Sequence, residues 1–144
     1  MPNSVAVGET KSWQMEFTKI KETCLYVQDL TRTTTFYTDV LGLPVIGQVA
    51  NRHVFFRVGS SVLLCFNAQK TRESKDLPPH FGEGQLHLAF ECTAEEYEAW
   101  KDKLRQADVS IEHEQTWPHE RKSCYFRDPD QHLLEIVVPG IWER

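Results

Sequence analysis

The sequence predicts an α+β fold made of two similar halves, each with the element order βαβββ. Three observations support this prediction. A strand pattern followed by an amphipathic helix opens each half, three short strand patterns follow each helix, and a Phe-Arg pair precedes the last turn of each half. A half of this size cannot cover its own sheet on both faces. We therefore expect the two sheets to surround a concave cup, with the helices outside.

The first half follows an N-terminal arm, residues 1–17, which shows neither helical nor strand periodicity. Residues 18–67 form the first module. Its opening strand is expected over residues 19–28, and Asp29 then caps a helix that Gly42 ends. The three strands that follow are expected at 44–49, 53–58 and 61–67.

The second half follows a linker, residues 68–84, which holds charges, two prolines and two glycines. This composition is typical of an exposed connection. Residues 85–144 form the second module and the C-terminal tail. It opens with a strand over residues 85–92, and Thr93 and Glu96 then form a capping box that starts a helix. The three strands that follow are expected at 109–114, 122–127 and 133–138.

Composition narrows the class of partner and the compartment. The 144 residues carry a formal charge of -5 with scattered cations, so no basic stripe for nucleic acid is present. The longest apolar run, Val62–Phe66, is five residues, which is too short to cross a membrane. We find no secretory signal pattern, and the four cysteines are widely spaced. We therefore expect a cytoplasmic protein with reduced thiols.

The repeat makes four positions equivalent. Counting eight residues from the arginine of each Phe-Arg pair reaches Cys65 in the first half and Glu135 in the second. Glu22 and His87 occupy matching places in the two opening strands. We expect all four side chains to face the cup.

Three of these residues have the chemistry of a metal site. Glu135 lies among apolar strand neighbours, where a carboxylate is costly to bury unless a cation or hydrogen bonds compensate its charge. With His87 and Glu22 it would supply one nitrogen and at least two oxygens, and would leave positions for water or substrate. Taken singly, a strand Glu is usually solvated, a strand His is usually a hydrogen-bonded core residue, and Cys65 is a small buried hydrophobe. Because the repeat places Glu22, His87 and Glu135 at equivalent points of one architecture, the metal-binding interpretation is favoured.

Three segments together resemble the vicinal oxygen chelate superfamily, which includes glyoxalases, bleomycin-resistance proteins and extradiol dioxygenases. The segments are ETCLYVQDLTRTTTFYTDVLGL, HLAF and YFRDPDQHLLEIV, and the resemblance spans residues 19–138. It implies two βαβββ modules that form an incomplete barrel around a metal, which chelates adjacent oxygens of a substrate. It also implies a homodimer, in which Glu22 of one subunit meets His87 and Glu135 of the other.

The resemblance assigns the three metal ligands to Glu22, His87 and Glu135, and Glu22 is a departure because the family normally has His there. Such a set favours Mn²⁺, Fe²⁺ or Mg²⁺, and Zn²⁺ and Ni²⁺ stay open. In glyoxalase I enzymes the position of Cys65 often carries a Glu that moves the substrate proton. A thiol cannot easily repeat that role, so an orthodox glutathione-dependent glyoxalase I is disfavoured.

Other cup residues are expected from strand parity, from the repeat and from the resemblance. Tyr125 lies where related fosfomycin-resistance enzymes place a substrate-contacting Tyr, and with His53 it is our candidate for substrate positioning or proton transfer. The candidate substrate-binding residues are Phe55, Ser123, Cys65 and Tyr26. The alternatives are that Tyr125 is an ordinary strand aromatic and that His53 faces solvent. The loop TWPHERK either caps the cup or is a solvated loop.

The leading hypothesis is a metal-dependent enzyme that binds a small molecule through two neighbouring oxygens and stabilises an enolate or another oxyanion. Isomerisation, addition to an epoxide or another group, and ring-opening oxygenation all remain open. The alternative is a metal-free protein that sequesters an apolar or aromatic drug in the same cup. A structural or regulatory partner would need an exposed apolar patch, which the sequence does not identify.

Overall fold

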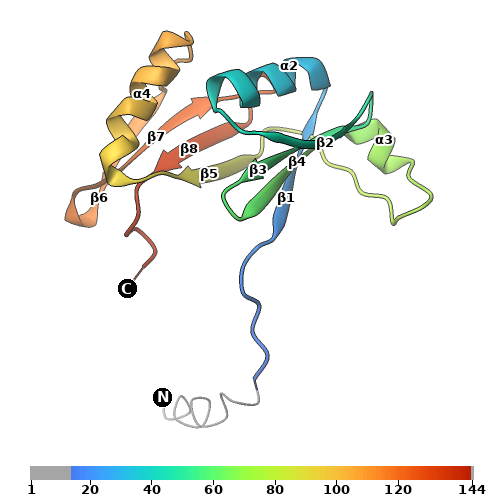
Figure 1. The fold of residues 1–144 in the computed structure, drawn as a ribbon, viewed down its shortest axis with the longest axis horizontal. Helices are drawn as coiled ribbons and strands as arrows, with labels where there is room; N and C mark the ends of the chain where they lie inside the picture. The colour runs from blue at the N-terminus through green and yellow to red at the C-terminus, as the bar shows by residue number, and fades with distance from the viewer. Residues whose placement is uncertain (1–13, 144) are drawn as a thin grey trace.

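The computed structural model describes residues 14–143 (Figure 1). The first half consists of β1 (Glu22–Val27), α2 (Leu30–Thr35), the π-helical turn η2 (Phe36–Val40), β2 (Val45–Val49), β3 (His53–Val58) and β4 (Ser61–Asn67). A short helix, α3 (Ala68–Arg72), follows. The second half consists of β5 (His87–Glu91), η3 (Ala94–Glu96), α4 (Tyr97–Gln106), β6 (His113–Trp117), η4 (Pro118–Glu120), β7 (Arg121–Arg127) and β8 (Leu133–Val137).

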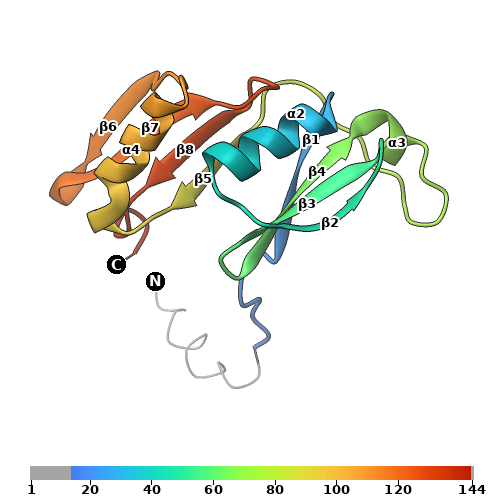
Figure 2. The same cartoon turned by 45° about the horizontal axis from the view of Figure 1, so that its top comes forward.

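The predicted repeat is confirmed in the sheets. The strand orders are β1-β4-β3-β2 and β5-β8-β7-β6, and in each sheet the opening strand pairs in parallel with the last. The two sheets lie side by side, and α2 and α4 lie on the same side of them (Figures 1 and 2). Each sheet therefore has one face, which we call the open face, that none of the helices within residues 14–143 covers. The chain alone does not close a barrel.

Three elements differ from the sequence prediction. The helix capped by Asp29 winds its second part as a π-helical turn before Gly42, whose φ is 70°. The linker contains α3, which its composition did not indicate. The strand expected at 109–114 begins its pairing only at His113. The strand pattern came from Val109 and Ile111, whose side chains pack against the core ahead of the paired residues. Within residues 14–143, no helix is both long enough and apolar enough to cross a membrane.

Strand alternation explains the core. In each sheet one set of alternate residues is buried under the helices, and the other set lies on the open face. The buried set includes Leu25, Val27, Val54, Phe56, Leu63, Cys65, Cys124, Phe126, Leu134 and Ile136. Each of these apolar side chains stabilises the fold by roughly 1.5–3 kcal/mol when it is fully buried, less for cysteine.

A buried carboxylate joins the two halves. The hydroxyl of Tyr37, on η2, donates to Oδ2 of Asp128 at 2.6 Å. Oδ1 of Asp128 accepts from the backbone N–H groups of Asp130 and His132, both at 2.9 Å. Burial, followed by the Asp128 charge, raises the pKa of Tyr37 well above its usual value, so its hydroxyl remains a donor.

The imidazole of His132 makes a second link, and it is almost fully buried. The backbone N–H of Leu86 donates to Nδ1 at 2.9 Å, so Nε2 carries the proton and donates to the carbonyl of Tyr26 at 2.8 Å. The backbone N–H of Gln28 also donates to Asp130 Oδ1 at 3.0 Å. The loop before β8 thus holds the end of β1 in the other half.

We predict that Asp128→Ala destabilises the protein by about 3–5 kcal/mol, because it leaves three buried donors without an acceptor. Urea denaturation measures the change in the free energy of unfolding. Asp39→Ala is the matched control, because Asp39 is exposed on η2 and its loss should cost less than about 0.5 kcal/mol. Equal effects of the two substitutions would show that the Asp128 network does not join the halves.

Candidate functional site

His87 and Glu135 lie together on the open face of the second sheet. The strands β5 and β8 are neighbours, with His87 opposite Leu133 and Ala89 opposite Glu135. Nε2 of His87 lies 3.4 Å from Oε1 of Glu135. The Glu135 side chain is 11% exposed, whereas that of His87 is 49% exposed. A carboxylate that has lost this much water needs a positive partner.

The hydrogen bond on the other side of the His87 ring shows what that partner can be. Nδ1 lies 2.8 Å from the carbonyl oxygen of Leu133, and a carbonyl only accepts, so Nδ1 carries a proton. In the neutral ring, Nε2 then directs a lone pair toward the Glu135 carboxylate. Two acceptors in this position repel each other unless a proton or a metal cation lies between them. A backbone acceptor that orients the far nitrogen is typical of metal-binding histidines.

Tyr125 completes this part of the site. It lies opposite Glu135 on the neighbouring strand β7. Its ring stacks on that of His87, with the ring centroids 6.3 Å apart and an interplanar angle of 26°. Burial, and then the Glu135 carboxylate, raises the pKa of Tyr125. The phenol is therefore protonated at neutral pH and can donate a hydrogen bond to an oxygen of a substrate.

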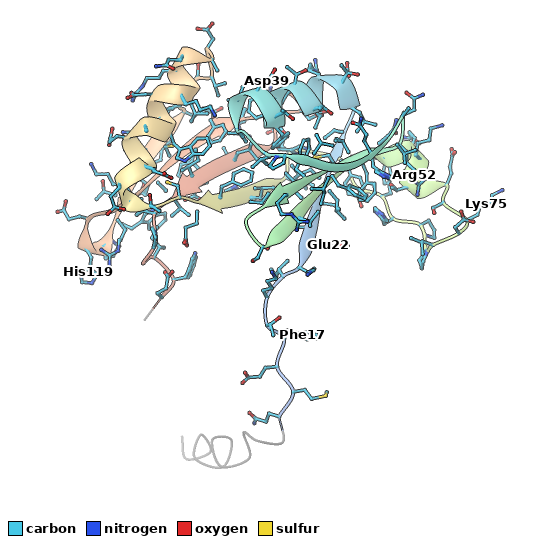
Figure 3. The ribbon with its side chains drawn as sticks, viewed as in Figure 1. Phe17, Glu22, Asp39, Arg52, Lys75 and His119 are labelled. Carbon is cyan, nitrogen blue, oxygen red and sulfur yellow. The ribbon has the colours of Figure 1, made fainter. Side chains whose placement is uncertain are left out.

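Glu22 lies apart from these residues in a single chain. It is exposed at the start of β1, opposite Val62, in the first sheet (Figure 3). Among the described residues of one chain, no group of three or more His, Cys, Asp and Glu side chains could hold a metal ion. The chain thus brings together two of the three predicted ligands. Whether Glu22 of a second copy joins them remains a prediction.

The assignment of Cys65 to the cup was wrong, because the two hairpin turns differ in length. Arg57 pairs with Val62, five residues later, whereas Arg127 pairs with Leu133, six residues later. Counting eight residues from each arginine therefore reached opposite faces of the two sheets. The position equivalent to Glu135 is held by Leu64.

Cys65 faces the helices instead. It lies opposite Leu25 and Val54 and is fully buried in the core. Burial, and then the charge of Asp128, raises the pKa of its thiol well above the usual value. Neither a substrate nor a metal on the open face can reach it.

The open face of the first sheet carries an aromatic cleft built around His53. Its ring stacks on that of Phe55, with centroids 4.0 Å apart and an interplanar angle of 8°, and Phe66 meets both rings edge-on. Burial, and then the neighbouring charge of Arg52, lowers the pKa of His53, so the ring is neutral at pH 7. Its Nδ1 is buried without a hydrogen-bond partner in the described part of the chain. His53 can therefore accept a proton.

His80 is a residue of this cleft that sequence reasoning missed. The Tyr26 hydroxyl lies 2.6 Å from Nδ1 of His80. Burial, and then a contact with Cys24, raises the pKa of Tyr26 to about 12, so the phenol is the donor. The same segment places Phe81 3.5 Å below the guanidinium of Arg72. The segment around His80 thus contacts the cleft, while most of the other linker residues are exposed, as their composition indicated.

Ser123 lies on the same face of β7 as Tyr125, two residues away, and its role in substrate binding remains a prediction. Its side chain is fully buried, and the indole Nε1 of Trp117 donates to its hydroxyl at 3.0 Å. Ser123 therefore holds Trp117 in place. The rest of the TWPHERK loop turns outward, with His119 exposed at its tip (Figure 3).

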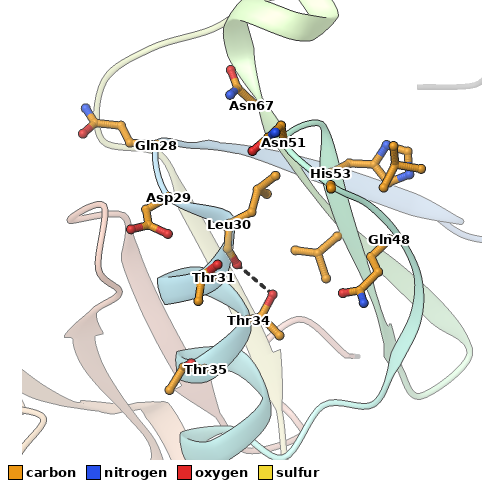
Figure 4. Close-up of a pocket in the computed structure, with 13 residues that line it drawn as sticks. Gln28, Asp29, Leu30, Thr31, Thr34, Thr35, Gln48, Asn51, His53 and Asn67 are labelled. Atoms are coloured by element: carbon orange, nitrogen blue, oxygen red, sulfur yellow. Dashed lines mark hydrogen bonds between the residues drawn. The ribbon is translucent and has the colours of Figure 1, made fainter.

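A second groove lies between α2 and the turn that joins β2 to β3 (Figure 4). Amide and hydroxyl side chains line much of it, including Gln48, Asn51 and Asn67, and Thr34 Oγ1 donates to the Leu30 carbonyl at 2.7 Å. His87, Glu135 and Glu22 are not among its lining residues. The open faces of the sheets are therefore the better candidate for a metal site.

The register of β4 generates a direct test with two adjacent positions. We predict that Cys65→Glu destabilises the protein by about 4 kcal/mol or more, because it buries a carboxylate in the core. Leu64→Glu should cost at least about 2 kcal/mol less, because its carboxylate points to the open face. Urea denaturation of both variants measures the difference. If Leu64→Glu were the more damaging of the two, the assigned faces would be reversed.

Comparison with known proteins agrees with this architecture. Residues 19–136 match the family model described as the Glyoxalase/Bleomycin resistance protein/Dioxygenase superfamily. The metallothiol transferase FosB of Lysinibacillus sphaericus is 30% identical over 82% of this chain and 80% of its own. The glutathione transferase FosA of Serratia marcescens is 31% identical over 83% and 80%.

A solved structure extends the agreement to three dimensions. The crystal structure of lactoylglutathione lyase from Agrobacterium tumefaciens superposes with a TM-score of 0.86 at 30% identity, covering 90% of this chain and 100% of that one. The similarity therefore extends over nearly the whole chain. The chain therefore belongs to the glyoxalase/bleomycin resistance protein/dioxygenase superfamily.

Proposed function

We propose that this protein is a metal-dependent enzyme that acts on a small molecule and holds a divalent cation with His87, Glu135 and Glu22 of the partner subunit. The observation that carries the proposal is the 3.4 Å approach of His87 Nε2 to the nearly buried Glu135 carboxylate, while Nδ1 of the same ring is bonded to the Leu133 carbonyl. A cation bound there would polarise adjacent substrate oxygens and stabilise the negative charge that develops on them.

The arrangement of the sheets supports a homodimer. Both open faces point away from the helices, toward the same side of the chain (Figure 1). The open face of the first sheet carries Tyr26, Phe55, Leu64 and Phe66, and such an apolar surface favours association. If a second copy placed its second sheet over this face, Glu22 of the first copy would lie next to His87 and Glu135 of the second copy.

The names of three relatives support a proposal that the reaction involves a thiol. Their names refer to a metallothiol, to glutathione and to lactoylglutathione. We propose that a low-molecular-weight thiol adds to an electrophilic carbon of the substrate. The sulfur–carbon bond forms as a carbon–oxygen bond breaks, and the electron pair moves to the oxygen.

Two side chains of this protein can handle the protons of that step. The neutral ring of His53 of the partner subunit, which lies on the same sheet as Glu22, would accept the proton of the thiol, and the Tyr125 hydroxyl would donate a proton to the oxygen that leaves carbon. Burial lowers the pKa of His53, so its ring is neutral before the step, and raises the pKa of Tyr125, so its phenol is protonated. The step conserves protons, and solvent then returns each residue to its starting state.

The alternative is a metal-free protein that sequesters a drug in the aromatic cleft. Such a protein would gain from the apolar residues of the first sheet but would have no use for the His87–Glu135 pair. Without a cation, the nearly buried carboxylate would depend on a proton between it and His87. Metal binding therefore separates the two proposals.

We predict that Glu135→Gln and His87→Gln each lower Mn²⁺ affinity at least tenfold, or about 1.4 kcal/mol, because each removes a ligand. Metal content after equilibrium dialysis measures the loss. Glu91→Gln is the matched control, because Glu91 is an exposed carboxylate on the same strand, β5, but pairs with Val137 rather than with Glu135. A wild-type protein that binds none of Mn²⁺, Fe²⁺ or Zn²⁺ would favour the metal-free binder.

Mixing variants tests whether two copies share the site. Glu22→Gln and His87→Gln homodimers should both bind metal weakly. A mixed dimer contains one site in which both changes meet and one site with all three native ligands. It should therefore recover about half of the wild-type metal content. No recovery in a verified mixed dimer would place the ligands within one chain.

We also predict that the Mn²⁺-loaded protein joins a thiol to fosfomycin, an oxirane that tests the proposed ring-opening step. Mass spectrometry should detect an adduct with glutathione or cysteine. Tyr125→Phe should lower kcat about 100-fold with unchanged metal content, because it removes only the proton donor. A wild-type protein that binds metal but forms no adduct would contradict the thiol-transfer proposal and leave the metal site standing.

A further inference from the structure

We infer that the segment just before β1, residues 14–20, packs on a second copy of the chain. We call this segment the arm below; it includes the last four residues of the N-terminal arm predicted from the sequence. The inference rests on the two-copy assembly proposed above. The arm's two most exposed apolar residues, Met15 and Phe17, lie outside residues 19–136, which the family model matches.

Hydrogen bonds to the first sheet anchor the end of the arm. The backbone N–H of Val62 donates to the Lys21 carbonyl at 3.1 Å, and the Ser61 hydroxyl donates to the Ile20 carbonyl at 3.3 Å. The ammonium group of Lys19 reaches the Ser60 carbonyl. These bonds to the β3–β4 turn set the direction in which the preceding residues leave the sheet. Figures 1 and 2 show the arm continuing away from the body of the chain.

The arm carries apolar side chains that the chain itself does not cover. Met15 is 96% exposed, Phe17 is 100% exposed and Ile20 is 77% exposed. In an extended segment, residues two apart point the same way, so Met15 and Phe17 share one face. Covering both side chains would remove a large apolar area from water. Since the described part of this chain leaves them exposed, we assign their cover to another molecule.

The position of the arm identifies that molecule as a second copy. Phe17 lies just before Glu22, on the side opposite the helix that carries Asp39 (Figure 3). The open faces, which the proposed partner covers, are on the Phe17 side. The C-terminal segment leaves the fold on that side as well (Figure 1), and its Trp142 is 92% exposed. Each copy therefore offers an apolar arm and an exposed indole at the face where the two copies would meet.

Photocrosslinking of the full chain tests the inference. A benzophenone amino acid in place of Phe17 should yield a covalent dimer on irradiation, with the crosslinked peptide mapped to the other subunit by mixing isotopically labelled and unlabelled chains. The same amino acid at Asp39, exposed on the helix side, is the matched control and should yield none. Crosslinks only within one chain, or equal yields at both positions, would overturn the inference.

A second measurement separates this inference from the proposed function. The double variant Met15→Ser/Phe17→Ser should raise the dimer dissociation constant at least about tenfold in analytical ultracentrifugation. Its metal content should be unchanged at concentrations where it is dimeric. An unchanged dissociation constant in a dimer that still binds metal would overturn the arm contact alone. A wild-type protein that is monomeric at all concentrations would overturn both the shared site and the arm contact.

Discussion

The buried hydrogen bonds of the loop from Asp128 to His132 hold the two halves of this protein in one arrangement. The sheets are separate in the described residues, so no backbone ladder joins them. Asp128 binds Tyr37 of the first half, and His132 binds the carbonyl at Tyr26. Because these groups are shielded from water, their bonds are costly to break. With the shared core, they keep both open faces on the side away from the helices.

That arrangement divides the site chemistry between two sheets. The second sheet supplies the polar groups, His87, Glu135 and Tyr125, and the first supplies aromatic surface around His53. Leu64 takes the place that pseudo-symmetry would give to a further carboxylate, so the cup is chemically unequal on its two sides. In the proposed site, this inequality leaves an apolar wall beside the cation. A Glu rather than a His at position 22 makes the proposed ligand set richer in oxygen and harder.

Most elements could be predicted because their signals are local. Asp29 and Thr93 cap helices through bonds to residues three positions later, and alternation identified β3 and β4 with their observed bounds. The errors arose where a distant contact decided the outcome. The turn between Arg127 and Leu133 is one residue longer than the turn between Arg57 and Val62, so equal counting did not reach equivalent positions. A shift of one residue exchanges the two faces of a strand. This is why Cys65 was assigned to the cup.

The sequence by itself determined the βαβββ repeat, the family and the residue types able to bind a cation, because periodicity, caps and side-chain chemistry are properties of short segments. Only the tertiary structure decided which of those residues meet. It brought His87 to Glu135, left Glu22 on the other sheet, covered Ser123 with Trp117 and packed His80 against Tyr26. These contacts join residues far apart in the chain, and they depend on strand register and turn length, which local patterns do not encode.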